Sequence, residues 1–429
     1  MNKHVYRKIK GFRDIFGDEI YYWHIVEDNF KEIFNVYGYE EVKLPILERL
    51  EVFRKGLGDT SDIVDKEMFS FIDRDSQPVV LRPEGTASVV RFYIENNIFQ
   101  ENKIDRFYYY GPMFRRENPQ KGRFRQFYQV GVEALGSASP ILDSEVIKLS
   151  SEIFKSFNVN LNIQLEINSI GCQTCRQSYV SVLLEYLKSK SVHLCDNCNK
   201  KIDSNPLRVF DCKNELCKLT MQSAPEISSF LCKDCKNHFL EVKENLNKFN
   251  VEFVVNPKLV RGLDYYMRTA FEIVTDYFGA TLAVGAGGRY DGLVKNLGGP
   301  DIPGIGFAIG VDRLVAVLKE LKDVGKDIRF FVVYQNNSLM DFAIRLLNEL
   351  RENHIKAFAD YTGKGLKSQL RMANKYLADY ALILGEEELN GNYITIKNMK
   401  DGQQKRLNRN DIVVAIKSKF IDGGVKCFQ

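Results

Sequence analysis

The residues with the clearest chemical potential lie in the segment 110–133, YGPMFRRENPQKGRFRQFYQVGVE. Two aromatic-rich stretches flank a polar tip, residues 117–122, and this pattern predicts a long antiparallel hairpin. Planar guanidinium groups on stiff strands suit bidentate binding of phosphate or carboxylate. A solvated charged hairpin is the structural alternative, and composition alone does not separate the two. The cations are Arg115, Arg116, Lys121, Arg123 and Arg125, opposed by Glu117 and Glu133.

A second segment with chemical potential is residues 77–90, QPVVLRPEGTASVV. A short strand meets Pro83, and Gly85 with Thr86 opens a helix. The Thr86 hydroxyl could cap that helix, which is the structural explanation for this residue. Glu84 lies at the strand end, where side chains project into a cleft. Its carboxylate therefore requires a cationic partner, such as an amino group.

Three further segments combine glycine with arginine or tyrosine. Arg261 lies beside a glycine, in a turn where the backbone can approach a ligand closely. With Tyr265 and Tyr266 it could equally form a surface cation–π pair. Arg313 lies at the start of an apolar helix, so it either serves a site or extends to water. The segments are RGLDYY (261–266), the glycine-rich AVGAGGRYDGL (283–293) and GIGFAIGVDRLVAVL (304–318).

Eight of the nine cysteines lie between residues 172 and 235. Three pairs have CxxC spacing and one is wider, a pattern typical of structural zinc ligands because neighbouring thiolates can reach one tetrahedral ion. Four pairs could build one or two sites of four thiolates, and the spacing leaves the partition open. Reduced thiols packed between helices are the alternative. The pairs are Cys172 with Cys175, Cys195 with Cys198, Cys212 with Cys217, and Cys232 with Cys235.

The elements that position these groups follow from hydrophobic periodicity and chain breakers. Residues 21–37 predict an amphipathic helix that a glycine ends. Residues 39–48, YEEVKLPILE, predict one strand, which Pro45 restricts to a sheet edge. The cysteine-rich region is expected to be a small helical module, with helices over residues 179–188 and 225–249.

The last part of the chain, after a charged linker at residues 323–327, alternates strands with helices. That alternation implies a mixed, parallel-rich sheet covered by helices. The turn at residues 363–365, Gly-Lys-Gly, opens one of these helices and either binds an anion there or only caps the helix. Residues 328–429 contain 16 Lys and Arg against 11 Asp and Glu, a net charge of +5 that weakly favours a polyanionic partner.

Composition sets the broad class of the protein. The chain has 429 residues, enough for two or three domains, with 45% apolar and 27% charged residues as in an ordinary globular protein. No run of eighteen apolar residues exists, so no membrane span is expected. The first residues, MNKHVYRKIKGFRDIFG, are basic but lack an apolar signal core. We expect a cytoplasmic protein with reduced thiols.

Five motifs in order, LRPEGTA, GPMFRRENPQKGRFRQF, RGLDYY, GGRYDGL and GIGFAIGVDRL, resemble the class II aminoacyl-tRNA synthetases. RGLDYY after RPEGT narrows the resemblance to the histidyl-tRNA synthetase family, and the resemblance runs from Lys10 to the C-terminal helix. It implies an α+β fold with a class II antiparallel sheet core, a helical insertion and a C-terminal α/β anticodon-binding domain. The implied domains are a catalytic core in two parts, residues 1–170 and 251–322, a cysteine-rich insertion, 171–250, and an anticodon-binding domain, 328–429.

The same resemblance implies ATP-dependent attachment of L-histidine to tRNA(His) through a histidyl-adenylate, with Mg²⁺ bound to ATP. Gln120 would meet the acceptor end of the tRNA, and Arg125 could replace Arg123 in phosphate binding. The residues carried over as catalytic are Arg115, Arg261 and Arg313. Those implied to bind histidine are Glu84, Gly85, Thr86, Arg115, Gln129, Glu133, Arg261, Tyr265 and Tyr266. Those implied to bind ATP are Arg115, Glu117, Arg123 and Arg313.

The resemblance also implies partners. A homodimer is expected, and the insertion would help to hold the tRNA acceptor arm. Family members without these cysteines fold, so any zinc would be structural and specific to a lineage. Two rival interpretations are a non-catalytic regulatory subunit of ATP phosphoribosyltransferase, which would lack the anticodon domain, and a stand-alone nucleic-acid-binding protein, which Glu84 and Glu133 disfavour because they would repel phosphate.

Overall fold

The computed structural model describes residues 6–58, 61, 63–101, 103–119, 122–157, 162–210, 212–260, 263, 265–277, 282–321 and 328–418. The chain forms two compact units, Met1–Asp323 and Val324–Gln429, and each has its own hydrophobic cores. The expected linker at residues 323–327 lies outside the described residues. In the described part of the chain, no helix is both long and apolar enough to cross a membrane.

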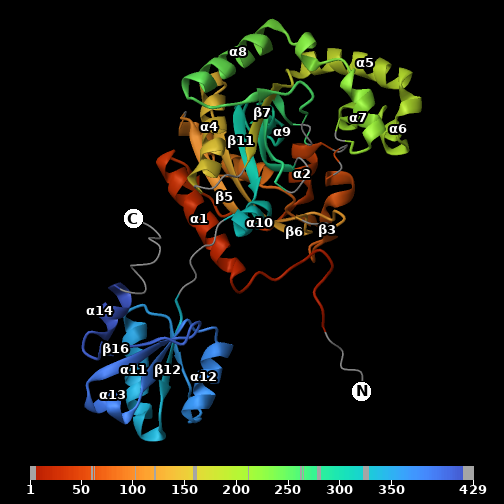
Figure 1. Cartoon of the computed structure of the whole chain (residues 1–429). Helices are drawn as coiled ribbons and strands as arrows, with labels where there is room; N and C mark the ends of the chain where they lie inside the picture. Colours follow the sequence, from red (N-terminus) through yellow and green to blue (C-terminus); the bar gives the residue numbers. More distant parts are fainter. Residues whose placement is uncertain are drawn as a thin grey trace, which may run out of the picture. The chain divides into compact units, whose positions relative to one another are not determined.

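An eight-stranded sheet forms the centre of the larger unit (Figure 1). Its inner strands pair antiparallel, and only the two edge pairs, β1 with β5 and β7 with β8, are parallel. This confirms the antiparallel core that the sequence predicts. In spatial order the strands are β1 (Glu40–Glu41), β5 (Asp105–Phe114), β6 (Gln126–Leu135), β11 (Gly304–Gly310), β10 (Leu282–Arg289), β9 (Met267–Thr275), β7 (Ile163–Ser169) and β8 (Val254–Val255).

The predicted hairpin is the pair β5 and β6, which keeps a regular register from Asp105 opposite Leu135 to Phe114 opposite Gln126. Successive side chains of a strand point to opposite faces. Val130 and Val132 therefore enter the core on one face, and Gln129 lines a cavity on the other.

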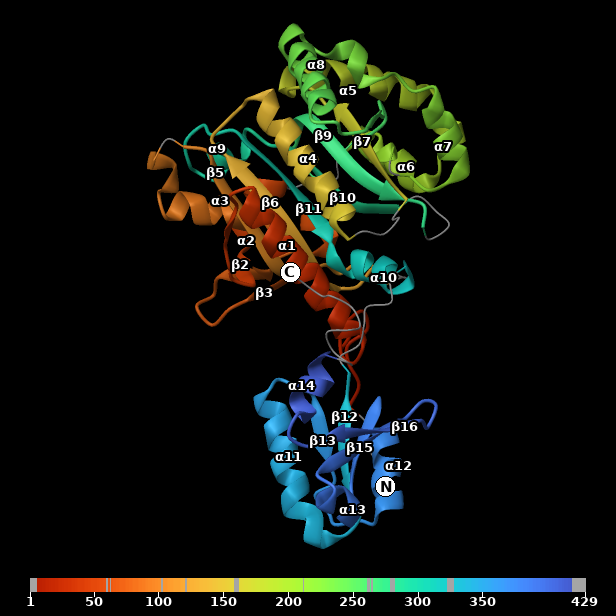
Figure 2. The same cartoon turned by 60° about the vertical axis from the view of Figure 1, so that its left-hand side comes forward.

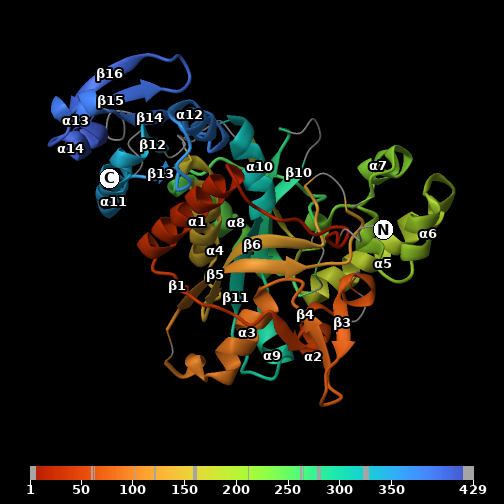
Figure 3. The same cartoon turned by 90° about the horizontal axis from the view of Figure 1, so that it is seen from below.

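Helices cover both faces of this sheet (Figures 2 and 3). One face packs against the longer helices in a continuous apolar core, and the other packs against shorter ones. The first set is α1 (Glu19–Val36), α4 (Pro140–Ser156), α8 (Lys233–Lys248) and α10 (Val311–Leu321). The second set is α2 (Leu50–Leu57), α3 (Thr86–Glu95) and α9 (Leu293–Asn296), with the short turns η1 (Ile63–Glu67) and η2 (Ile98–Glu101) nearby in the chain.

The strand predicted over residues 39–48 is wrong in its length, whereas its position at a sheet edge is confirmed, because β1 is an edge strand of the large sheet. The segment contributes β1 to the large sheet and then begins β2 (Leu47–Arg49) of a separate three-stranded sheet, with β4 (Pro78–Leu81) and β3 (Phe69–Ile72). Between them the carbonyls of Leu44 and Pro45 accept hydrogen bonds from the buried Arg82 guanidinium. Proline has no N–H to donate to a ladder, so the chain changes sheets there.

The cysteine-rich region folds as a helical module, seen at one end of the unit in Figure 1. The helix predicted over residues 225–249 is wrong in its first part, because the backbone is extended at Leu231 and Cys232 and divides it into two elements. The elements of the module are α5 (Gln173–Ser189), η3 (Ser191–His193), α6 (Asp196–Lys201), η4 (Pro206–Val209), α7 (Glu215–Gln222) and η5 (Ile227–Phe230), followed by α8.

The smaller unit is the predicted mixed sheet with helices on it. Its strands are, in order, β13 (Ala357–Ala359), β12 (Phe330–Tyr334), β14 (Tyr380–Leu384), β15 (Tyr393–Asn398) and β16 (Gln404–Asn408). The first three strands are parallel to one another, β15 pairs antiparallel with β14, and β16 pairs antiparallel with β15. Its helices are η6 (Asn337–Leu339), α11 (Met340–Glu352), α12 (Leu366–Lys375), α13 (Glu386–Asn390) and α14 (Ile412–Ile416).

Candidate active site

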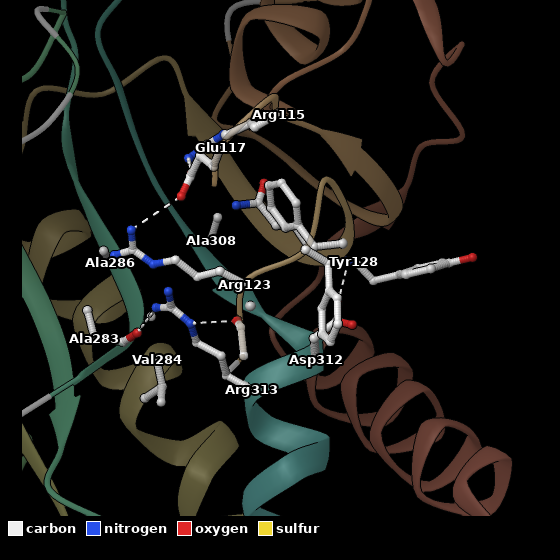
Figure 4. A pocket seen from close by; sticks show the side chains of 16 residues that line it. Arg115, Glu117, Arg123, Tyr128, Ala283, Val284, Ala286, Ala308, Asp312 and Arg313 are labelled. Atoms are coloured by element: carbon white, nitrogen blue, oxygen red, sulfur yellow. Dashed lines mark hydrogen bonds and ion pairs between the residues drawn. The ribbon is translucent and has the colours of Figure 1, made fainter. Parts of the chain in front are cut away.

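Two cavities of about 320 and 170 Å³ open on the sheet of the larger unit. They form one cleft, because six residues line both of them. We call the larger cavity the carboxylate arm and the smaller one the guanidinium arm, which is drawn in Figure 4. The shared residues are Arg115, Glu117, Arg123, Gln129, Ala286 and Ala308.

Glu84 lies in the carboxylate arm, at the start of α3. Its two carboxylate oxygens accept hydrogen bonds from the backbone N–H groups of Thr86 (2.7 Å) and Ala87 (2.9 Å). Glu84 therefore caps the helix, whereas the sequence suggested that the Thr86 hydroxyl would do so. The helix N-terminus stabilises this buried negative charge. Burial nevertheless raises the pKa of Glu84, an effect that these hydrogen bonds and the nearby Arg115 cation oppose.

The Thr86 hydroxyl instead donates to Oε1 of Glu133, at 2.6 Å. The Tyr290 hydroxyl donates to the other oxygen of Glu133, so three distant segments meet at one carboxyl group. Glu133 is 1% exposed, and burial raises its pKa from 4.5 to about 8, although both hydroxyl donors favour the charged form. Glu133 thus lies behind Thr86 and itself lines neither cavity, although each of its oxygens can accept a second hydrogen bond.

Aromatic side chains and one amide complete the carboxylate arm. Tyr265 and Tyr266 both line it, with their ring centroids 4.7 Å apart. The Gln129 amide oxygen and the Tyr109 hydroxyl are buried and have no hydrogen-bond partner among the described residues. Buried polar atoms are nearly always paired, so these two are available to a ligand.

Gly85 lines neither cavity. A side chain at this position would collide with the ring of Tyr109, so Gly85 gives that ring its place in the wall. The first seven residues of the glycine-rich run 283–293 belong to strand β10, and a turn at Asp291 and Gly292 follows before α9. Gly285 of the strand lines the guanidinium arm, and only Ala286 of this run lines both arms.

Two guanidinium groups face one carboxylate where the arms join. Glu117 pairs with Arg123 at 3.2 Å and lies 3.9 Å from Arg115. Arg115 is held from behind, because its Nε donates to the Pro83 carbonyl at 2.9 Å and its guanidinium lies over Phe127. The Arg125 guanidinium faces backbone carbonyls and lines neither cavity, so the geometry favours Arg123 for the phosphate role.

Arg313 is the third guanidinium of this arm, and it projects from the start of α10 in the same direction as Arg123 (Figure 4). It donates to the backbone carbonyls of Ala283 and Gly122. Burial lowers the pKa of Arg313, and the cations Arg123 and Arg115 lower it further. The arm therefore holds more positive charge than its own carboxylates balance, which is the condition for binding a polyanion.

An ion-pair network holds Arg313 in place. The neighbouring Asp312 accepts from the Tyr128 backbone N–H at 2.7 Å and pairs with Arg13 at 2.7 Å. Arg13 also pairs with Glu19 at the start of α1, at 2.6 Å. The start of α10 is thus fixed to both the hairpin and α1.

Two of the predicted site residues, Arg261 and Gln120, lie outside the described residues. The structure adds residues that the sequence did not single out. Tyr109 and Arg208, the latter from η4 of the helical module, line the carboxylate arm, and Tyr290 donates a hydrogen bond to Glu133. The position of Tyr290 in the motif GGRYDGL could have indicated this residue, whereas no pattern in the sequence indicates Arg208.

At the anion site suggested at residues 363–365, the turn binds a carboxylate of the chain itself. The Asp360 carboxylate accepts the backbone N–H of Lys364 at 2.8 Å and the N–H and hydroxyl of Thr362. This turn is therefore closed by the chain's own carboxylate.

The eight cysteines form two groups, and within each group the sulfur atoms all lie within 4.8 Å of one another. The first pair joins the last pair, and the two middle pairs join each other. The groups are Cys172, Cys175, Cys232 and Cys235, and Cys195, Cys198, Cys212 and Cys217.

An antiparallel sheet with a cationic hairpin crossing its cleft defines a class II aminoacyl-tRNA synthetase. The family model described as "Histidyl-tRNA synthetase" matches residues 11–314, and the model described as "Anticodon binding domain" matches residues 329–419. The chain belongs to the histidyl-tRNA synthetase family.

Relatives of known sequence and structure agree with this assignment. The chain is 44% identical to the histidine–tRNA ligase of Thermodesulfovibrio yellowstonii, over 97% of this chain and 99% of that protein. It is 43% identical to that of Clostridioides difficile, over 96% and 99%. The crystal structure of apo histidyl-tRNA synthetase from S. aureus superposes with a TM-score of 0.76, at 33% identity, covering 96% of this chain and all of that one.

Proposed function

We propose that this protein attaches L-histidine to tRNA(His), using ATP and forming a histidyl-adenylate. The observation that carries the proposal is the cleft, in which the buried carboxylate of Glu84 lies in one arm near Arg115, and Arg123 and Arg313 line the other arm. An amino acid and a triphosphate would meet where the two arms join. Full-length relatives with this enzyme name support the same reaction.

The first step joins histidine to ATP. A carboxylate oxygen of histidine attacks the α-phosphorus of ATP, the bond to the β-phosphate oxygen breaks, and pyrophosphate leaves. Arg115, with Arg261 by family resemblance, would hold the α-phosphate and the histidine carboxylate, while Arg123 and Arg313 hold the distal phosphates. Fixed cations aimed at the developing charge stabilise such a transition state.

The second step transfers the histidyl group. A terminal ribose hydroxyl of the tRNA attacks the acyl carbon and releases its proton to the solvent, and AMP leaves with the electrons of the broken acyl–phosphate bond. Gln120, at the tip of the hairpin, is proposed to contact the acceptor end. Positioning accounts for most of the acceleration in such a reaction.

The carboxylate arm would select histidine. We propose that Glu84, Thr86 and Gln129 bind the amino group, and that Glu133 and Tyr266 read the two imidazole nitrogens. The unpaired amide oxygen of Gln129 supports this assignment. An amino acid without the imidazole donor pattern would leave buried polar groups unpaired, which is a strong basis for rejection.

Mg²⁺ would enter with ATP as its complex. Mg²⁺ prefers phosphate oxygens and water with one or two carboxylates. Glu117 lies at the junction of the arms and can provide one. When bound, the ion neutralises charge on the phosphates.

The chain's other parts suggest its partners. We propose that residues 328–429, of which 329–419 match the anticodon-binding model, read the tRNA anticodon, and that the insertion, 171–250, helps to hold the acceptor arm. A cytoplasmic homodimer is proposed from family resemblance, with the two parts of the core, 1–170 and 251–322, forming each active site. The regulatory-subunit alternative is not favoured, because such a protein lacks the anticodon domain.

Histidine-dependent exchange of pyrophosphate into ATP tests the proposal. The wild-type protein should catalyse exchange with histidine and not with other amino acids. Arg115→Ala should lower exchange at least about a hundredfold, since a fixed charge at the reacting phosphate is lost. Arg116→Ala is the matched control, because this neighbouring side chain is exposed and lines neither cavity. Histidine binding without exchange would overturn the assignment.

A further inference from the structure

The two cysteine groups have the dimensions of tetrahedral metal sites. Zinc lies about 2.3 Å from each thiolate, so the sulfur atoms of a regular tetrahedron are about 3.8 Å apart. The structure has 3.5 Å between the sulfurs of Cys172 and Cys175, and 3.9 Å between those of Cys195 and Cys212. A disulfide requires about 2.05 Å, and all eight cysteines are free.

We propose that the protein binds two structural zinc ions, each held by four thiolates, and that the partition follows the fold rather than the order along the chain. The first and last cysteine pairs form what we call the base site, and the two middle pairs form the tip site. The base site is Cys172, Cys175, Cys232 and Cys235. The tip site is Cys195, Cys198, Cys212 and Cys217.

The base site joins the two ends of the module. Cys172 and Cys232 immediately precede α5 and α8, helices of 17 and 16 residues, and Cys175 and Cys235 lie three residues further on. The Cys232 backbone N–H donates to the Cys175 sulfur at 3.1 Å across 57 residues of chain. A thiolate is favoured at such a position, because helix N-termini and N–H donors stabilise its charge.

The chain entering the base site has no room for a side chain. Gly171 has φ of +67°, and a Cβ there would lie 2.5 Å from the Cβ of Cys175. Only glycine adopts this conformation without strain and also allows Cys175 to point inward.

The tip site adds a metal to a small apolar cluster, in which Ile202, Val209 and Met221 are buried. Its cysteines connect α6 and α7, which have 6 and 8 residues, and helices this short are marginal by themselves. The Cys195 backbone N–H donates to the Cys217 sulfur at 3.2 Å. Metal binding stabilises the folded state directly in small modules of this kind.

Packing alone does not explain these cysteines. A cysteine that serves as a small apolar side chain is normally buried. Cys232 is exposed, and Cys172, Cys195 and Cys212 are only half-buried, yet the sulfur of each points into its group.

Both metal sites lie next to residues that line the cleft. The importance of this contact for catalysis rests on the function proposed for the cleft. Next to the base site, the Arg176 guanidinium donates to the Tyr266 backbone carbonyl, and the Gly171 carbonyl accepts from the Arg268 N–H at 2.8 Å. Next to the tip site, η4 carries Arg208 into the wall of the carboxylate arm, four residues before Cys212. We infer that the metals hold Tyr266 and Arg208 in position.

Metal analysis of double variants tests the partition. Full-length protein purified without chelator should contain two zinc ions per chain. Cys175→Ser with Cys235→Ser should remove one of them, because both residues belong to the base site. Cys175→Ser with Cys198→Ser should remove both, because each site loses a ligand. Cys427→Ser is the control, since this ninth cysteine lies outside the described residues and far along the chain from the other eight, and it should leave two zinc ions.

Each alternative gives a different zinc content. If the sites followed the chain order, the Cys175/Cys198 double variant would keep one zinc and the Cys175/Cys235 variant would lose both, which overturns the partition. Fewer than two zinc ions in the wild type, or iron instead of zinc, overturns the proposal.

Cobalt provides a measurement that needs no variant. Metal-free wild-type protein titrated with Co²⁺ should develop the intense absorption of tetrahedral cobalt thiolate up to two equivalents, and an endpoint at one or none contradicts the proposal. Neither measurement depends on charging activity. A protein with two zinc ions and no histidine-dependent exchange would therefore refute the proposed function and leave the metal sites intact.

Discussion

Glu133 makes the stability of the protein depend on pH. Its pKa in the folded state is about 8, raised by burial from the ordinary 4.5. Between these two values the folded state keeps a proton that the unfolded state has lost, so stability falls as the pH rises through this window. Glu133→Gln cannot ionise and should remove that part of the decline. Thermal unfolding of both proteins between pH 5 and 8.5 measures it, and parallel curves would contradict the burial argument.

Tyr290 is predicted to position Glu133. Tyr290 directly follows strand β10, and its hydroxyl donates to one oxygen of that carboxyl group. Tyr290→Phe removes the donor, and one hydrogen bond to this protonated carboxyl group, about 1 kcal/mol, corresponds to about fivefold in affinity. We expect the KM for histidine in pyrophosphate exchange to rise by about that factor while the KM for ATP stays unchanged.

The matched control for Tyr290 is Tyr334→Phe, which removes an equally buried hydroxyl that donates to the Asp360 carbonyl in the smaller unit. It should leave both KM values unchanged. An equal rise in the KM for ATP in Tyr290→Phe would indicate a general structural loss instead of a positioning role.

At the scale of elements, Asp143 of α4 joins four segments of the larger unit. It accepts from Arg289 Nε at 3.1 Å, from His238 at 2.8 Å and from the Thr269 hydroxyl at 2.5 Å, and it is fully buried. Burial opposes ionisation, but the His238 and Arg289 partners hold the pKa of Asp143 below its usual value. The carboxylate thus fastens α8 and strands β9 and β10 to α4.

Asp143→Asn is therefore predicted to destabilise the fold strongly. Removing one partner of a buried ion pair costs about 3–5 kcal/mol, because the other charge stays buried. Glu145→Gln, two residues along the same helix, is the control, since its pair with Arg106 is partly exposed and should cost less than about 1 kcal/mol. Urea unfolding compares the two, and equal costs would refute the argument.

Several elements were predictable because their signals are local. The hairpin of β5 and β6 and the helix before Gly38 follow from aromatic alternation, helical spacing and glycine stops. The failures arose where distant contacts decide. Residues 39–48 divide between two sheets because Arg82 binds the carbonyls at the break. The helix expected from residue 225 begins only at Lys233, because the chain extends at Cys232 beside Cys175.

At the scale of the whole molecule, the two units have separate hydrophobic cores. We therefore expect the larger unit to activate histidine without the smaller one. A chain ending at residue 323 is predicted to keep histidine-dependent pyrophosphate exchange within about threefold, because the cleft lies entirely in the first unit. Its KM for tRNA should rise at least about tenfold, because the smaller unit, with its net positive charge, would no longer contact the phosphates of the tRNA. Loss of exchange, measured alongside circular dichroism that shows a folded chain, would contradict this division.

By itself, the sequence determined the family and the reaction, and it predicted most of its site residues at positions that line the cleft. Motifs such as LRPEGTA and GIGFAIGVDRL are contiguous, and short-range periodicity records the elements around them. Only the tertiary structure decided how Glu133 meets Thr86 and Tyr290, which lie 47 and 157 residues away, and which cysteines share a site. Spacing along a chain limits what neighbouring residues can reach, but only the folded sheet determines which distant side chains come together.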